Sequence, residues 1–123
     1  SKSAPSAIGP YSPAVVAPPF VFVSGQLPTD PITGEFAGDT AAQQAEQCIT
    51  NLEAILGAAG LTLSDVVKTT VLLADIADFA AVKEVYARRF TGPVLPARSA
   101  FQAAALPKGA KVEIEAIARL RPE

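Results

Sequence analysis

Two alternating segments near the end of the chain constrain its fold more strongly than any other feature. Residues 97–104 and 111–119 both read as strands, and Leu106-Pro107-Lys108-Gly109 between them contains the proline and glycine typical of a turn. Successive side chains of a strand point to opposite faces of its sheet. We therefore expect two neighbouring strands, with Arg98 and Glu113 projecting from the same face.

The preceding residues alternate between strand-like and helix-like segments. Residues 11–17 and 20–25 read as two strands flanking Pro18-Pro19, and proline there indicates an edge position or a loose connection. Turn-forming residues are dense over 27–38, which predicts a loop with room for a short hairpin. Residues 66–74 form a β-branched run typical of an interior strand.

A first helix should run from about Thr40 to Ala59. Thr40 and Gln43 fit a capping box, and Gly60 is a typical C-terminal stop. Apolar residues follow the three-and-four spacing of one buried stripe, and Cys48 lies within it. We therefore interpret the Cys48 thiol as a buried core group and not as a reactive one.

A second helix should begin at Asp75 or Asp78 and reach about Phe90. Gly92-Pro93 follows as a stop signal. Its charged side chains predict an outer face in solvent, made by Lys83, Glu84, Arg88 and Arg89.

This order, strand, strand, helix, strand, helix, strand, strand, predicts an α+β fold. Two helices can cover only one face of a sheet of five or six strands, so the other face must meet water or another copy of the chain. We expect the uncovered face to carry Arg98, Glu113 and Glu115. It should also carry neutral groups such as Ala100 and Ile117, a mixture that favours self-association.

Composition excludes several classes of function. The chain of 123 residues has no histidine and a single cysteine, which rules out an internal disulfide, a Cys/His zinc site and a histidine base. Ten basic residues are scattered among twelve acidic ones, so nucleic acid is not favoured as a partner. No apolar run approaches the roughly 18 residues of a membrane span. We expect one domain over residues 1–123 and, without a charged-then-apolar leader, a cytoplasmic location.

Arg98 and Glu113 offer the clearest chemistry. An arginine fork holds a carboxylate with two parallel hydrogen bonds, and a nearby glutamate can orient water and move protons. From spacing alone, however, the simpler interpretation is a cross-strand ion pair of Arg98 with Glu113 or Glu115, worth about 0–1 kcal/mol if exposed.

Three further residues have two readings each. Ser24 and Gly25 could offer a hydroxyl and a backbone N–H to an anion, or form a plain strand end. Tyr11 could cover a pocket or simply pack against its neighbours. The residues alone leave these alternatives open.

Five stretches of the chain resemble the Rid family, also called YjgF. They are Ala7-Ile8-Gly9-Pro10-Tyr11, Val23-Ser24-Gly25-Gln26-Leu27-Pro28, Asp65-Val66-Val67-Lys68-Thr69-Thr70-Val71, Pro96-Ala97-Arg98-Ser99, and Leu106-Pro107-Lys108 with Val112-Glu113-Ile114-Glu115-Ala116-Ile117-Ala118. The resemblance covers nearly the whole chain and is strongest to the RidA branch, the enamine and imine deaminases.

This resemblance implies a chorismate-mutase-like α+β fold with two helices on one face of a mixed sheet. It also implies a homotrimer with a central barrel and with clefts between neighbouring subunits. The implied reaction is hydrolysis of 2-aminoacrylate, 2-iminopropanoate and 2-iminobutanoate to 2-keto acids and ammonia. No metal or organic cofactor takes part in that reaction.

The resemblance also assigns roles by position. Arg98 matches the family arginine that binds the substrate carboxylate, and Glu113 matches the glutamate that positions the attacking water. Tyr11, Ser24 and Gly25 match residues that line the same cleft. Glu115, the second glutamate of its motif, looks structural.

Two positions depart from the bacterial pattern. Ala100 stands where a cysteine often follows Arg-Ser, and because this cleft position can contribute through its backbone, we expect activity to survive the change. Lys83 stands where an asparagine is common. Its charge could alter substrate preference or lie on the helix exterior, and both interpretations remain open.

Two other classes of function compete with the enzyme. One is a metabolite-sensing or protein-binding trimer without useful turnover. The other is a ribonuclease or translation inhibitor, for which this acidic chain offers no basic patch.

Overall fold

The computed structural model describes residue 4 and residues 9–122, so Ala7 and Ile8 of the first motif lie outside the described residues. The predicted order of strands and helices is confirmed. The elements are β1 (Ala14–Ala17), β2 (Phe20–Gln26), α1 (Ala41–Ala58), β3 (Val66–Leu73), α2 (Phe79–Arg89), β4 (Ala97–Gln102) and β5 (Val112–Arg119).

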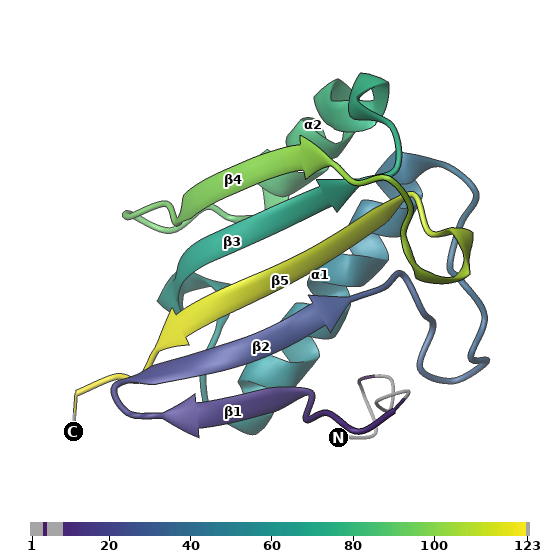
Figure 1. Ribbon diagram of the computed structural model, residues 1–123. Helices are drawn as coiled ribbons and strands as arrows, with labels where there is room; N and C mark the ends of the chain where they lie inside the picture. The colour runs from purple at the N-terminus through teal and green to yellow at the C-terminus, as the bar shows by residue number, and fades with distance from the viewer. Residues whose placement is uncertain (1–3, 5–8, 123) are drawn as a thin grey trace.

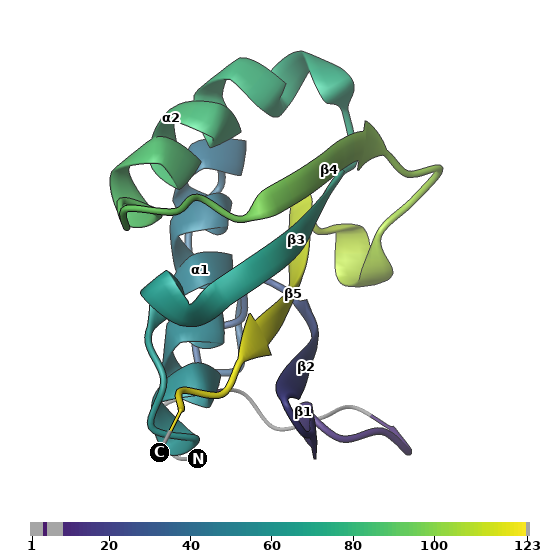
Figure 2. The ribbon, with the colours of Figure 1, turned by 90° about the vertical axis from the view of Figure 1, so that its left-hand side faces the viewer.

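The strands form one mixed sheet with the order β1-β2-β5-β3-β4 (Figure 1). Neighbouring strands are antiparallel except β3 and β4, which are parallel. Both helices lie against the same face, and the other face is uncovered (Figure 2). The expected two-layer α+β fold is therefore present. None of the helices in the described part of the chain is long and apolar enough to cross a membrane.

Helix α1 begins and ends where its sequence signals predict. The Gln43 backbone N–H donates to Thr40 Oγ1 at 3.1 Å, and the Thr40 N–H donates to Gln43 Oε1 at 3.1 Å, which completes the capping box. Gly60 follows the helix with φ +76°, a conformation that favours glycine. Cys48 is fully buried in the inner stripe, and burial raises the pKa of its thiol, which confirms the core interpretation.

The core lies between α1 and the covered face of the sheet. Strand β5 buries every second side chain there, and β3 does so from Thr69 onward, after a register shift between Val66 and Lys68. These side chains pack against the apolar stripe of α1, and the largest fully buried members of the core include Ile49, Leu52, Leu56, Val71, Leu73, Val112 and Ile114.

The predicted pairing of the two final strands is wrong. Strand β3 lies between β4 and β5, and the connection from β4 to β5 passes over its end. There the Ala103 N–H donates to the Leu73 carbonyl at 2.8 Å, and the Ala74 N–H donates to the Lys111 carbonyl at 3.0 Å. Residues 106–109 therefore belong to a crossover, not to a hairpin turn.

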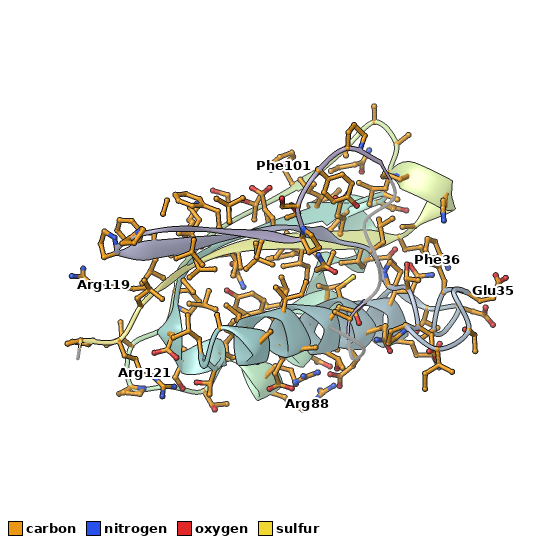
Figure 3. The ribbon with its side chains drawn as sticks, turned by 90° about the horizontal axis from the view of Figure 1, so that it is seen from below. Glu35, Phe36, Arg88, Phe101, Arg119 and Arg121 are labelled. Atoms are coloured by element: carbon orange, nitrogen blue, oxygen red, sulfur yellow. The ribbon has the colours of Figure 1, made fainter. Side chains whose placement is uncertain are left out.

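The inserted strand also changes the side on which Arg98 lies. Arg98 is level with Thr69 of β3, which in turn is level with Ala116 of β5, and both of these are buried on the helix side. The expectation that Arg98 and Ala100 share the uncovered face with Glu113 is therefore wrong. Phe101, the next residue after Ala100, projects from the uncovered side instead, whereas Arg88 lies on the helix side (Figure 3).

The segment before α2 contains both predicted caps. Asp75 accepts a hydrogen bond from the Ala77 N–H at 2.9 Å and caps a short 3-10 turn, Ile76–Asp78. Asp78 is the N-cap position of α2 but makes no side-chain cap bond. The two aspartates thus start consecutive helical turns, and only Asp75 caps with its side chain.

The charged side of α2 is not simply solvated, which corrects that prediction for its last turn. Arg89 forms ion pairs with Glu46 at 2.8 Å and Glu53 at 3.3 Å, both on α1. Its neighbour Arg88 approaches Glu46 at 3.5 Å. These pairs connect the two helices along their outer edges.

Candidate active site

A cavity of about 320 Å³ lies beside the end of β2. It brings together four of the predicted site residues, Tyr11, Ser24, Gly25 and Glu113. The sequence-based prediction did not place the other lining residues there, namely Leu27, Pro107 and Lys108. The sequence did contain a signal for all three, because Leu27 belongs to the second of the five family-like motifs and Pro107 and Lys108 belong to the fifth.

A β-bulge shapes this cavity. The register of β2 against β5 pairs Val23 with Ala116 and Gln26 with Ile114, so Ser24 and Gly25 together face one residue of β5. A Cβ atom at position 25 would overlap the carboxylate of Glu113. The glycine therefore leaves the space that the Glu113 carboxylate occupies.

Ser24 holds the preceding segment at the rim of the cavity. Its hydroxyl donates to the Ser12 carbonyl at 2.7 Å, and its backbone N–H donates to the Pro13 carbonyl at 2.9 Å. These bonds anchor the residues next to Tyr11. Because the hydroxyl proton is already donated, Ser24 Oγ faces a ligand as an acceptor, not as the donor that an anion would need.

Glu113 is a half-buried carboxyl with a shifted pKa. Burial disfavours its charged form and raises the pKa above the usual range, and the nearby charge of Glu115 acts in the same direction. Such a carboxyl holds a proton at higher pH than an exposed glutamate, which suits a group that must both accept and return protons.

Glu115 lies in a different environment from Glu113. It lines a separate cavity of about 340 Å³ on the uncovered face, together with Lys68 and Thr70. The two glutamates of the motif are therefore separated by the structure, and only Glu113 shares a cavity with Gly25 and Tyr11.

Arg98 lies over two aromatic rings on the helix side of the sheet. Its guanidinium carbon is 5.0 Å from the centre of the Tyr86 ring and 5.3 Å from that of Phe79. Both are cation–π distances, which orient the planar guanidinium without using its hydrogen-bond donors. Tyr86 is itself fixed by a buried hydrogen bond of 2.7 Å between its hydroxyl and Thr69 Oγ1.

No carboxylate of residues 9–122 lies within 4 Å of the Arg98 guanidinium. The cross-strand ion pair with Glu113 or Glu115, which spacing alone favoured, is therefore absent from this part of the chain. The fork of Arg98 remains exposed at the sheet edge, and a planar anion is the ligand it fits best.

Ala100 lies two residues along β4 on the same side as Arg98. It is level with Val71 of β3 and packs partly against the core. Neither Ala100 nor Arg98 lines the cavity that contains Glu113. Within one chain, the predicted site residues therefore form two groups on opposite sides of the sheet, one around Glu113 and one around Arg98.

The described residues hold no group of three or more cysteine, aspartate or glutamate side chains close enough together to bind a metal ion.

Comparisons with known proteins agree in pointing to one family. The model of the family described as Endoribonuclease L-PSP matches residues 1–120. The RutC family protein y4sK of Sinorhizobium fredii is 56% identical over 120 residues, which cover 98% of this chain and 94% of the relative. The 2-iminobutanoate/2-iminopropanoate deaminase of Rattus norvegicus is 52% identical over 118 residues, covering 96% of this chain and 85% of the enzyme.

A solved structure gives the same result for the fold. The crystal structure of the YjgF gene product from E. coli matches with a TM-score of 0.93 at 47% sequence identity, covering 98% of this chain and 96% of that one. Because the family model and these relatives span almost the entire sequence, the chain belongs to the Endoribonuclease L-PSP family, which is the YjgF/Rid family.

Proposed function

We propose that this protein hydrolyses 2-enamine and 2-imine acids to 2-keto acids and ammonia, with 2-aminoacrylate, 2-iminopropanoate and 2-iminobutanoate as substrates. Relatives from rat, goat and human, 50–53% identical over nearly the whole chain, carry the name of this deaminase. The observation that carries the proposal is the Glu113 carboxyl, held against Gly25 in a cavity with its pKa raised.

Glu113 acts as the proton carrier in this reaction. It takes a proton from water as the water oxygen attacks the imine carbon and gives a proton to the imine nitrogen, which forms a carbinolamine. It then takes the proton of the carbinolamine hydroxyl and passes it to the nitrogen, and as the C–N bond breaks the carbonyl forms and ammonia leaves. One water is consumed and no electrons are transferred. Such imines also hydrolyse in water without an enzyme. The protein therefore needs only to orient the substrate and the water and to transfer protons in order to accelerate the reaction.

Arg98 binds the substrate carboxylate through its two-donor fork. Within one chain, Arg98 and Glu113 lie on opposite sides of the sheet, so a single substrate can meet both only if they come from different copies. We place the site between neighbouring copies of a cytoplasmic homotrimer. Ala100 follows Arg98 along the same edge, and Tyr11, Ser24 and Gly25 accompany Glu113.

The composition of the uncovered sheet face supports association of copies. Val15 and Phe22 are 52% and 44% exposed there and line a cavity with charged Lys68 and Glu115, and Phe101 is 49% exposed on the same face. Large apolar side chains grouped with polar ones are typical of surfaces that pair with another molecule.

The direct test generates 2-aminoacrylate with a serine dehydratase and follows formation of the keto acid. The protein should accelerate this step. Arg98→Ala should lower kcat/KM by about 10–100-fold through loss of the carboxylate contact. Glu113→Gln should lower kcat by about 100-fold or more. Glu115→Gln, two residues along the same strand, should stay within about threefold of the wild type because it lines the other cavity.

No acceleration by the wild type would overturn the proposal. Binding of a 2-keto acid without turnover would instead support a metabolite-sensing protein.

A further inference from the structure

Two cationic side chains converge on one aromatic ring at the edge of the sheet. Lys83 Nζ lies 5.8 Å from the centre of the Phe79 ring, and the Arg98 guanidinium carbon lies 5.3 Å from the same centre. Phe79 and Lys83 are four residues apart and therefore lie on one side of α2. The two cationic groups are thus at most about 12 Å apart, since each lies within the 6 Å reach of a cation–π contact.

Neither cation is neutralised within residues 9–122. Arg88, Arg89 and Arg121 each have a carboxylate at 3.5 Å or closer, whereas neither Lys83 nor Arg98 has one within 4 Å. Glu84 adjoins Lys83 in sequence, but adjacent residues of a helix do not face each other. This edge of the molecule therefore presents two positive charges to an incoming anion.

We infer that Lys83 is a second anion-binding group and that the protein favours 2-imino acids with a second carboxylate on the side chain. This inference rests on the proposed function, in which Arg98 takes the carboxylate next to the imine. The reaction is unchanged: one water adds, the C–N bond breaks, and one ammonia leaves.

The dimensions of such a substrate lie within the upper bound of about 12 Å on the separation of the two cations. The carboxyl carbons of a four- or five-carbon diacid are about 4–5 Å apart, given C–C bonds of about 1.5 Å. A charge-assisted hydrogen bond adds about 2.8 Å at each end. The flexible lysine stem can adjust the remaining distance, because its ammonium is a point donor that does not demand a fixed plane.

The test compares two imines made in place by flavin-dependent amino acid oxidases, 2-iminopropanoate from alanine and 2-iminosuccinate from aspartate. Lys83→Met should lower kcat/KM for 2-iminosuccinate by roughly three- to tenfold. The value for 2-iminopropanoate should change by less than about twofold, because Lys83 has no group to bind there. The loss should appear mainly in KM, as expected for a contact made equally in the ground and transition states.

Arg88→Met is the matched control. It removes the same charge from the same helix, but Arg88 pairs with Glu46 of α1. At 3.6 residues per turn, its position in α2 is on the opposite side of the helix from Phe79. The Arg88→Met variant should show the same ratio of kcat/KM values for the two imines as the wild type. An equal shift in both variants would overturn the inference, because it would reveal only a general effect of net charge.

The remaining outcomes separate this inference from the proposed function. Turnover of 2-iminopropanoate with an unchanged preference in Lys83→Met would overturn the inference and leave the proposed function standing. If no imine is turned over, the proposed function fails. Calorimetric measurement of the affinities for 2-oxoglutarate and pyruvate then tests Lys83 without turnover. Lys83→Met should weaken the binding of 2-oxoglutarate only. Equal weakening for both keto acids, or no weakening, would overturn the role of Lys83.

Discussion

The side chains of Arg98 and Glu113 project from opposite faces of one sheet. Arg98 points toward the aromatic rings of α2, and Glu113 points toward the uncovered side. Arg98 is level with Ala116 of β5, three residues along from Glu113, and β3 separates the two strands. Typical strand spacings and rises put their backbones about 14 Å apart. A three- or four-carbon acid cannot reach both side chains of one copy.

Mixing two impaired variants should therefore restore activity above that of either one alone. Arg98→Met and Glu113→Gln chains, unfolded and refolded together in equal amounts, should recover about a quarter of wild-type activity. In a cyclic assembly, one site in four then receives an intact Arg98 from one copy and an intact Glu113 from the next. The measurement is the initial rate of keto-acid formation against each variant refolded alone.

Mixing Gly25→Ala with Glu113→Gln is the control for this experiment. Both changes lie in the same cavity of one chain, so no arrangement of copies rebuilds an intact site. Recovery in this control, or none in the first mixture, would contradict a site shared between copies.

The elements of this fold could be predicted from the sequence because their signals are local. The capping box of Thr40 and the alternation of β5 each depend on a few neighbouring residues. Strand partnership is a tertiary property, and nothing near Arg98 in sequence indicates that residues 66–73 insert between the last two strands. The side on which Arg98 lies is set by its register with Thr69, which alternation within one strand cannot supply.

Gly25→Ala should impair catalysis more than folding. The added methyl group would overlap the Glu113 carboxylate and displace it from its place in the cavity. A displacement of about 1 Å at a catalytic group can cost about 100-fold, so we expect kcat to fall by about 10–100-fold. Steady-state kinetics on 2-iminopropanoate, together with thermal unfolding, measure both effects.

Gly57→Ala is the comparison for that variant. Gly57 lies within α1, and an added Cβ would meet nothing within 4 Å. The Gly57→Ala substitution should raise the free energy of unfolding by about 0.5–1 kcal/mol, the usual gain for alanine over glycine in a helix, without changing kcat. Equal loss of kcat in both variants would contradict a specific role for Gly25.

Tyr86→Phe should destabilise the fold while preserving the ring beneath Arg98. The variant loses the 2.7 Å hydrogen bond to Thr69 Oγ1, which is completely buried and would be left without this partner. The expected cost is about 1–2 kcal/mol of unfolding free energy, with kcat/KM within about threefold. Denaturant unfolding of Tyr86→Phe, Thr69→Val and the double variant should show coupling of about 1 kcal/mol. Strictly additive costs would show that the bond contributes nothing to stability.

Glu113→Gln should raise stability at neutral pH and leave it unchanged in acid. The folded pKa of Glu113 lies above its ordinary value of 4.5, because burial and the Glu115 charge disfavour ionisation. Well below pH 4.5 the carboxyl is protonated in both states. As the pH rises through the folded pKa, the folded state must accept a half-buried charge that the unfolded state carries in water, so stability is lost. The glutamine variant avoids this loss, and its melting temperature should exceed that of the wild type at pH 7 and match it below pH 4 at equal protein concentration.

Glu53→Gln is the control for this variant. It removes an ion pair to Arg89 and should instead lower the melting temperature at pH 7. A Glu113→Gln protein that melts below the wild type at pH 7 would show that the carboxylate is stabilised in the folded state, against the desolvation argued here.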